Sequence, residues 1–433
     1  MEMSSFGAQD LGRKSLRVVW CLFALSMPVS FFGMQAFLAL GVLLLLWLGW
    51  RSRFQDWPRT PLDPALLVLA LSIGLSLLLS PNGWSSFRSN AAFLIALSFW
   101  VAYAGLQSER QLRLAVYGIW AIVALSALFG IYQSYTGHYP LANWLHPRVA
   151  NLLKPAPGVP GRFSAVGFFY SRLRFAHVLM FSFCVVFGVA MERMGWRMRS
   201  LLLGLLALLG FAILCTWVRT IPFAIGCALL VWIWWKIQRK LLRTLAVLSL
   251  AGLLGMALLF TPGFLTRVAH SFEGSRDWGR AVLWQTALDF TSEHPLTGIG
   301  FGNFPRDVRP VLERKVKEMG LDRFAGIIAF AHNDLLNIQA ECGFLGAFAY
   351  CFLFVAYLRT MLRALNRRDP DQPWLNGFLQ GSLIGVVAYL LSSVFHVHFF
   401  FMEVAYNLWF VLGSSLAALQ FQRIPPGTAP QGA

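Results

Sequence analysis

One histidine has neighbours and a position that suit acid–base chemistry. His332 and Asn333 stand where a long polar stretch ends and an apolar stretch begins. On a continuous helix of about 100° per residue, the face of His332 would also carry Gln339, Gly343 and Gly346, and such glycines let a neighbouring membrane helix come close. A helix N-terminus disfavours imidazolium, so His332 would stay neutral, as a general base must. The alternative is a polar residue that merely ends a membrane helix beside a packing face.

Two arginines are candidate phosphate ligands. Arg219 lies between two apolar runs. A charge near membrane depth is costly and usually functional, although a long side chain also reaches the interface simply as an anchor. Arg280 opens a stretch that is expected to form a helix, and its guanidinium offers a planar, bidentate and permanent charge.

The composition defines the fold class. Hydrophobic residues make up 57% of the 433 residues and charged residues 13%, and mean hydropathy is +0.61. A soluble domain carries about 25% charged residues. We therefore expect an all-α polytopic membrane protein. Its six cysteines fall in apolar segments without metal or disulfide spacing, which is typical of small core residues.

Apolar stretches predict about twelve transmembrane helices, each near the roughly 20 residues that a bilayer needs. Residues 1–260 would hold nine helices and a shorter loop at 135–172, residues 261–331 a large loop, and residues 332–433 three helices and a tail. The expected spans are two within 18–50, broken near 32–35, and one each near 65–80, 91–106, 114–133, 174–191, 200–217, 219–235, 244–260, 334–358, 375–395 and 400–420.

The distribution of arginine and lysine predicts the orientation. These residues gather in loops such as 51–59, 193–199, 236–243 and 359–368, and positive charge marks cytoplasmic loops. Both termini would then be cytoplasmic, and His332 would face the periplasm of a Gram-negative cell.

The two long outer loops are also basic, which long loops tolerate. We expect the large loop to hold a helix over 278–292 capped by Asp277, a turn over 293–303 and a helix over 305–319. Outer positive charge suits anionic partners such as pyrophosphate and membrane lipid headgroups, rather than nucleic acid. Anchoring to headgroups is the alternative for most of these side chains.

Other polar motifs are weaker. The glycines of 298–302 resemble a dinucleotide-binding fingerprint, but no strand precedes them, so a turn is favoured. Asp369-Pro370-Asp371 lies in a basic inner loop and is typical of a solvated turn. His396, His398 and Glu403 could line a cavity or bind a metal weakly, although interfacial polar residues are favoured. We expect no metal site and no cofactor.

Three stretches resemble the O-antigen ligase and polymerase superfamily of bacterial membrane enzymes. The resemblance covers about 200–350 and departs from the family pattern at Val218, where Ser is common, and at Leu345, where a small residue is common. A weaker match near 161–177 adds Arg162, with Arg172 and Arg174 as further cations. The stretches are Thr216-Trp217-Val218-Arg219-Thr220, the segment 279–304, and His332-Asn333 followed after nine residues by Gly343 and Gly346.

The resemblance implies a glycosyltransferase that moves a polysaccharide from undecaprenyl pyrophosphate to a sugar hydroxyl of lipid A core, with inversion and without metal. It implies His332 as the base and Arg219 and Arg280 as pyrophosphate ligands. Arg162, Arg172, Arg174 and Asn333 would contact substrate, with Asn333 either orienting His332 or capping the helix. Three alternatives remain open: an O-antigen polymerase, a protein O-oligosaccharyltransferase and a lipid-linked sugar flippase.

Overall fold

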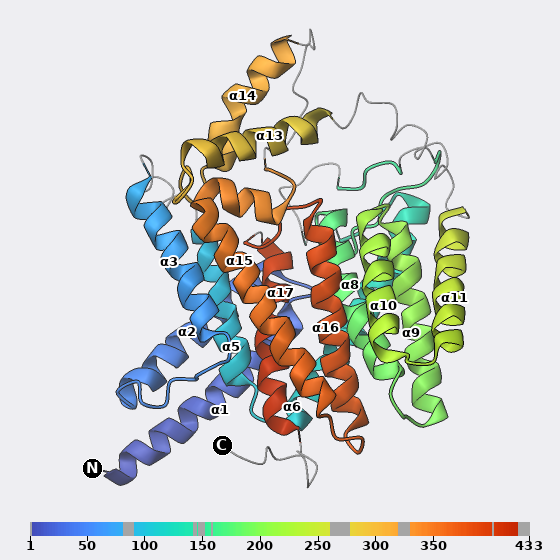
Figure 1. The fold of residues 1–433 in the computed structure, drawn as a ribbon. Helices are drawn as coiled ribbons and strands as arrows, with labels where there is room; N and C mark the ends of the chain where they lie inside the picture. Colours follow the sequence, from blue (N-terminus) through green and yellow to red (C-terminus); the bar gives the residue numbers. More distant parts are fainter. Residues whose placement is uncertain are drawn as a thin grey trace.

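The chain folds into a bundle of helices with two further helices beyond one end (Figure 1). The computed structural model describes residues 2–80, 91–141, 145, 152–156, 159–259, 278–318, 330–400 and 402–422. Within these residues the only strand-like pairing is an isolated bridge between Pro155 and Phe163. The all-α prediction is therefore confirmed.

The helices follow the apolar stretches of the sequence. Their bounds are α1 (Glu2–Ser26), α2 (Phe31–Arg51), α3 (Asp63–Leu79), the 3-10 helix η1 (Ala91–Leu97), α5 (Ser98–Gly105), α6 (Glu109–Thr136), α8 (Arg172–Ala190), α9 (Trp196–Cys215), α10 (Thr220–Lys236), α11 (Lys240–Leu259), α13 (Trp278–Glu293), α14 (Phe304–Glu318), α15 (Asp334–Asn366), α16 (Pro373–Ser393), α17 (Met402–Ala418) and the 3-10 helix η2 (Leu419–Phe421).

Seven helices in the described part of the chain are long and apolar enough to cross a membrane, so the protein is multi-pass. They are α2, α6, α8, α9, α15, α16 and Glu403–Phe421, and three shorter apolar helices accompany them. Every predicted span coincides with helix, but the count of twelve is not confirmed.

Two predicted spans differ in detail from the helices that form. The first break lies at 27–30 instead of 32–35, because Ser30 caps α2 by accepting the Gly33 N–H at 3.0 Å. The span predicted at 91–106 is divided between η1 and the short helix α5.

Helices α8 and α16 form a close central pair, which glycines make possible. A Cβ atom on Gly188 would lie 2.3 Å from the Gly377 carbonyl oxygen, and a Cβ on Gly381 would lie 2.5 Å from the Cys184 carbonyl oxygen. Small residues allow such backbone contact between membrane helices. This pair fixes the relative positions of His177 in α8 and the segment after α16, whose histidines lie against it.

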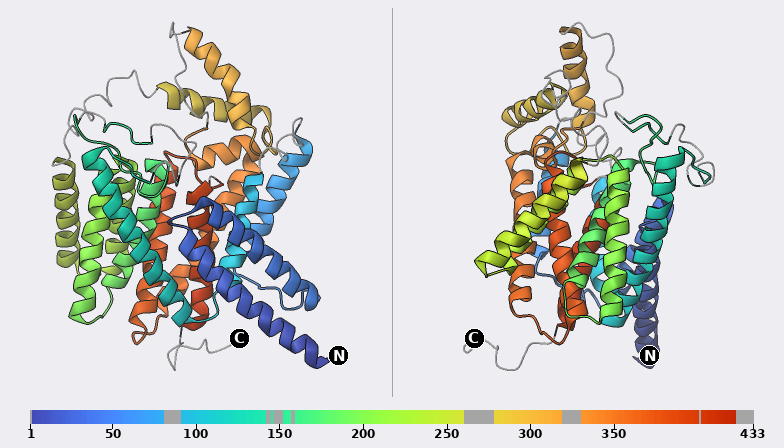
Figure 2. Two further views of the ribbon diagram at one scale, coloured as in Figure 1. Left: turned by 180° about the vertical axis from the view of Figure 1, so that it is seen from behind. Right: turned by 90° about the vertical axis from the view of Figure 1, so that its right-hand side faces the viewer.

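Helices α13 and α14 lie beyond one end of the bundle in every view (Figures 1 and 2). We call this the loop end. Helix α1 begins and α17 ends at the opposite end (Figure 1), which we call the terminal end.

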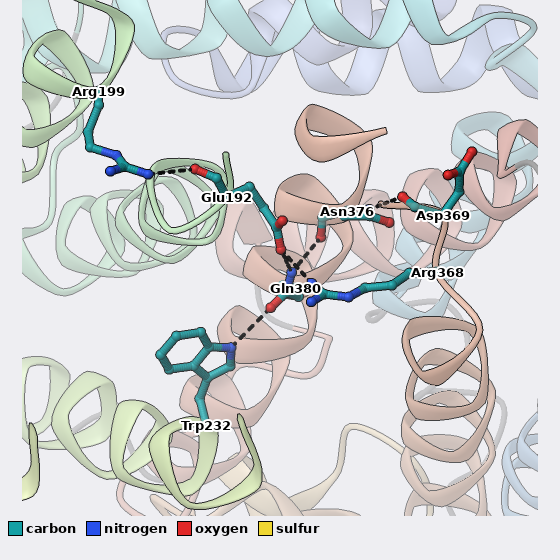
Figure 3. A network of polar contacts seen from close by, with 7 residues as sticks. All are labelled: Glu192, Arg199, Trp232, Arg368, Asp369, Asn376 and Gln380. Atoms are coloured by element: carbon teal, nitrogen blue, oxygen red, sulfur yellow. Dashed lines mark hydrogen bonds and ion pairs between the residues drawn. The ribbon is translucent and has the colours of Figure 1, made fainter. Parts of the chain in front are cut away.

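A polar network joins α9, α10 and α16 with the ends of α8 and α15 at the terminal end (Figure 3). Glu192, just after α8, pairs with Arg368 at 2.6 Å and also accepts a hydrogen bond from Gln380 of α16. Trp232 of α10 donates to Gln380 at 3.4 Å, and Arg199 of α9 donates to the Glu192 carbonyl at 2.9 Å. The network therefore holds these helices together at the end away from α13.

The Asp369-Pro370-Asp371 segment belongs to the same end. Asp369 accepts the Asp371 N–H at 2.9 Å, and its carbonyl oxygen accepts from Asn376 at 2.6 Å (Figure 3). These bonds form a local turn, as the sequence favoured.

Candidate functional site

The turn after α13 is bound directly to α15. It joins the two helices of the α13–α14 unit and brings the unit onto the loop end. Three main-chain hydrogen bonds make the contact: Phe344 N–H to the Pro295 carbonyl at 2.8 Å, Ile299 N–H to Ala340 at 3.0 Å, and Gly300 N–H to Glu341 at 3.1 Å.

Helix α15 can accept this turn because it is broken at Gly343. Gly343 has φ +68° and ψ −167°, and a Cβ there would lie 2.3 Å from the carbonyl carbon of Leu296. The expectation of one continuous helical face from His332 through Gly343 to Gly346 is therefore wrong. The glycine admits the backbone of the turn, not a neighbouring helix.

The glycines of 298–302 shape the same turn. Gly298, Gly300 and Gly302 all have positive φ, at +65°, +104° and +80°, a region that favours glycine. The buried Glu341 carboxylate accepts the N–H of Phe304 at 3.3 Å and so caps the start of α14. The turn interpretation is confirmed, with no strand before it in the described chain.

His332 lies at the start of α15 in a strained conformation. Its φ is +49°, which is uncommon for a residue other than glycine and is often associated with functional sites. Asn333 is the N-cap, and its side chain accepts the Leu336 N–H at 3.1 Å. Asn333 therefore caps the helix, which is one of the roles considered for it from the sequence.

The electrostatic surroundings of His332 favour a neutral ring. Burial lowers the pKa of His332 below its ordinary value, and the positive charge of Arg280 lowers it further. Arg280 itself is exposed, in the first turn of α13. The α13–α14 unit thus brings the first candidate phosphate ligand to the candidate base.

Asp334 binds the start of α15 to the segment between α16 and α17. Its buried carboxylate accepts the N–H of His398 at 2.6 Å, the N–H of Phe399 at 3.1 Å and the hydroxyl of Tyr389 at 2.6 Å. These bonds hold residues 396–399 beside His332.

His396 connects this segment to the second candidate phosphate ligand. Its Nε2 lies 2.8 Å from the Thr220 hydroxyl. Thr220 opens α10, and Arg219 is the N-cap of that helix. Burial lowers the pKa of His396 well below its ordinary value, and the charges of His177, His332 and Arg280 lower it further. The residue that follows Arg219 and the charge of Arg280 therefore both act on the same imidazole.

Three imidazoles gather behind His332. The ring centroids of His177 and His398 are 4.4 Å apart, those of His396 and His398 are 5.3 Å apart, and those of His177 and His396 are 5.9 Å apart. No group of metal-ligand type is found among the described histidine, cysteine and acidic residues. The sequence interpretation of His396 and His398 as interfacial residues missed this cluster, because His177 comes from a distant helix.

The weaker candidate cations occupy different surroundings. Arg162 lies over the Tyr135 ring at 3.5 Å, and Arg172 donates to the Ser164 hydroxyl at 3.2 Å. Arg174 is buried and pairs with Glu403 at 2.6 Å. Its charge is thus balanced inside the protein, whereas the other two side chains are only partly buried.

An apolar cavity of about 460 Å³ lies next to the start of α15. Its lining includes the aromatic side chains of Phe301, Phe330, Phe399 and Phe400 together with Asp334. The cavity is large enough for part of a lipid chain or a sugar ring, within the range of ligand pockets.

The fold and the site together define a multi-pass membrane protein with an arginine- and histidine-containing site at one end of its bundle. Residues 204–351 match the family model described as O-antigen ligase. A comparison with curated proteins finds no match. The matched segment contains Arg219, Arg280 and His332 but ends before His396. This segment of the chain is therefore similar to the O-antigen ligase family.

Proposed function

We propose that the protein is an O-antigen ligase of the bacterial inner membrane, with both termini cytoplasmic and the loop end periplasmic. It transfers a polysaccharide from undecaprenyl pyrophosphate to a sugar hydroxyl of lipid A core. The observation that carries the proposal is the gathering of His332, Arg280 and the Arg219 segment around His396. Such a set combines a neutral base with permanent positive charge, and it lies within or beside the family match.

The chemistry needs only these groups. Neutral His332 takes the proton of the acceptor hydroxyl while the hydroxyl oxygen attacks the anomeric carbon of the donor sugar. The bond between that carbon and the pyrophosphate oxygen breaks, and its electron pair leaves with undecaprenyl pyrophosphate. Arg219 and Arg280 stabilise the charge that develops on the leaving group. Displacement in one step inverts the anomeric carbon.

The surroundings of the site fit a lipid-linked donor. The isoprenoid chain would remain in the bilayer beside the helices, and the apolar cavity would accept an apolar portion of a substrate. The partly buried Arg162 and Arg172 would supply further positive charge near the donor. Arg174 would instead support the fold, because Glu403 balances its charge.

A reconstituted assay tests the proposal and separates it from the alternatives. Purified protein in liposomes receives undecaprenyl-pyrophosphate-linked glycan and one of three acceptors: lipid A core, a second lipid-linked glycan, or an acceptor protein. We expect product only with lipid A core. Product with the second glycan would establish a polymerase, product with the protein would establish an O-oligosaccharyltransferase, and movement of the lipid without covalent product would establish a flippase.

The base is tested in the same assay with two histidine variants. His332→Ala should reduce the transfer rate by about 10²- to 10⁴-fold, the usual contribution of general acid–base catalysis, while leaving the protein folded. His294→Ala is the matched control, because His294 is exposed in the turn after α13. Transfer by His332→Ala at the original rate would remove this residue as the base.

A further inference from the structure

The segment between α16 and α17 lies outside the family match but contacts the site on two sides. Asp334 holds its main chain at His398 and Phe399. The indole N–H of Trp409 donates to the Phe399 carbonyl at 3.3 Å, which anchors the same segment to α17. His396 is therefore carried by a backbone whose position is fixed by both α15 and α17.

The turn before α10 lacks regular helical geometry of its own. Trp217 has φ +58°, in the left-handed region. On the α9 side, the Thr216 hydroxyl donates to the Ile213 carbonyl at 2.6 Å and accepts the Val218 N–H at 3.3 Å. On the α10 side, the Thr220 side chain is held by His396. Arg219, directly before Thr220, has helical φ and ψ of −70° and −33°, and its carbonyl accepts the Phe223 N–H at 3.4 Å, so it belongs to the start of α10 that this side-chain contact holds.

We propose that His396 is a positioning residue of the transfer site, which holds Thr220 at the start of α10 and thereby directs Arg219 toward the pyrophosphate of the lipid-linked substrate. The inference rests on the proposed function, because it assigns a pyrophosphate to Arg219. It adds a residue beyond the matched segment and explains why the α16–α17 segment is anchored so firmly to the start of α15.

The charge state of His396 agrees with this role. The groups that face it are His177 and His398 of the imidazole cluster, His332 and Arg280. The charges of His177, His332 and Arg280, together with burial, keep the pKa of His396 below its ordinary value, so the ring is neutral at neutral pH. A neutral imidazole bonds the Thr220 hydroxyl without repelling the Arg280 guanidinium.

The alternative is that His396 only fills space within the imidazole cluster. His398 provides the comparison, because it packs against the same rings while neither of its ring nitrogens has a hydrogen-bond partner among the described residues. Its main-chain bond to Asp334 does not depend on its side chain. A packing role would make His396→Ala and His398→Ala similar, whereas a positioning role through Thr220 would not.

The test is a double-mutant cycle between His396 and Arg219, measured as the Kd of purified protein for undecaprenyl pyrophosphate without glycan. This probe requires no transfer reaction. His396→Ala should weaken binding by about tenfold, the value of one hydrogen bond to a charged ligand site. In the Arg219→Ala background, the same change should alter Kd less than about twofold, because the group that it positions is gone. His396→Gln and Thr220→Ser keep polar partners and should bind nearly as the unmodified protein does.

Several outcomes would overturn the proposal. An equal effect of His396→Ala in both backgrounds would mean a role independent of Arg219. Equal effects of His396→Ala and His398→Ala, or a lack of binding by the unmodified protein, would also refute it. If the cycle behaves as expected but no acceptor is glycosylated in the reconstituted assay, the positioning role stands and the proposed transfer activity falls. The two failures are therefore distinguishable.

Discussion

The positive charge of Arg280 lowers the pKa of His332, although the two residues lie on different helical units. Arg280 belongs to α13, which is bound to α15 by the turn after it, and His332 directly precedes the cap of α15. The electrostatic influence of Arg280 on His332 therefore depends on the break at Gly343 that admits this turn. The pKa of His332 therefore depends on how the α13–α14 unit is bound to α15.

The pH dependence of transfer should report this relationship. The base is active when neutral, so activity falls as pH decreases through the pKa of His332, which lies below the ordinary value of about 6.5. Arg280→Gln removes the positive charge, makes imidazolium less costly, and should move the acid limb of kcat/KM to higher pH. Arg280→Lys should leave the limb in place. An acid limb that stays at the same pH in Arg280→Gln would show that the charge of Arg280 does not influence the base.

The break in α15 should be sensitive to a single methyl group. Gly343→Ala places a Cβ about 2.3 Å from the Leu296 backbone, at a positive φ with ψ near 180° that is essentially restricted to glycine and alone costs about 1–3 kcal/mol. We expect a lower unfolding temperature and loss of transfer, because the turn after α13 must shift. Gly204→Ala, in α9 with no neighbouring atom within 4 Å, should be neutral or slightly stabilising. Equal unfolding temperatures for the two variants would contradict this account of the break.

Arg174 should act on stability and not on substrate binding. Arg174→Ala leaves Glu403 buried without its ionic partner, and breaking such a pair costs about 3–5 kcal/mol. We expect a marked fall in thermal stability in detergent, while Arg172→Ala, which loses one partly buried hydrogen bond, falls much less. A stable Arg174→Ala variant that has lost affinity for undecaprenyl pyrophosphate would restore the substrate role suggested by the sequence.

Transfer should not require a divalent metal. Two arginines can stabilise the leaving pyrophosphate, and the described residues contain no metal-ligand group. Activity should therefore persist after EDTA treatment and dialysis. Reversible loss of activity that Mg²⁺ or Mn²⁺ restores would show that a metal takes part.

The helices were predictable because each apolar run must satisfy its own backbone hydrogen bonds inside a bilayer. The start of α15 was also predictable, since Asn333 is a cap residue that acts within four residues of its own position. The number of spans was harder to predict, because α3 and α10 have only 17 residues each and because η1 and α5 divide another apolar run into short pieces.

Much of the site depended on tertiary contacts that a single sequence does not reveal. The positive φ of Gly343 follows from contact with a turn more than forty residues upstream. Helical periodicity alone therefore predicted a continuous face from His332 to Gly346 that does not form. His177, His396 and His398 come from two distant segments, and their proximity follows from the close pairing of α8 with α16. Arg219 and Arg280 were found by residue type and by resemblance, but His396, which bonds the residue after Arg219 and is influenced by the charge of Arg280, was not.

The central claim is that Arg219 and Arg280 act on one pyrophosphate beside His332. It is tested most directly by a double-mutant cycle on turnover of undecaprenyl-pyrophosphate-linked glycan. Each alanine variant should lower kcat/KM by about ten- to a hundredfold, as expected for charge-assisted contacts of roughly 1.5–3 kcal/mol. Lysine should rescue poorly because it keeps the charge but loses the planar fork.

The decisive quantity is how the loss of turnover in the double variant compares with the losses in the two single variants. Arg309→Ala, on the exposed surface of α14, is the matched control and should leave turnover unchanged. The account predicts that the Arg219→Ala, Arg280→Ala double variant loses less than the product of the single losses, because both groups act on one ligand. Strict multiplication of the two losses would show that the arginines bind separate partners and would contradict the shared pyrophosphate site.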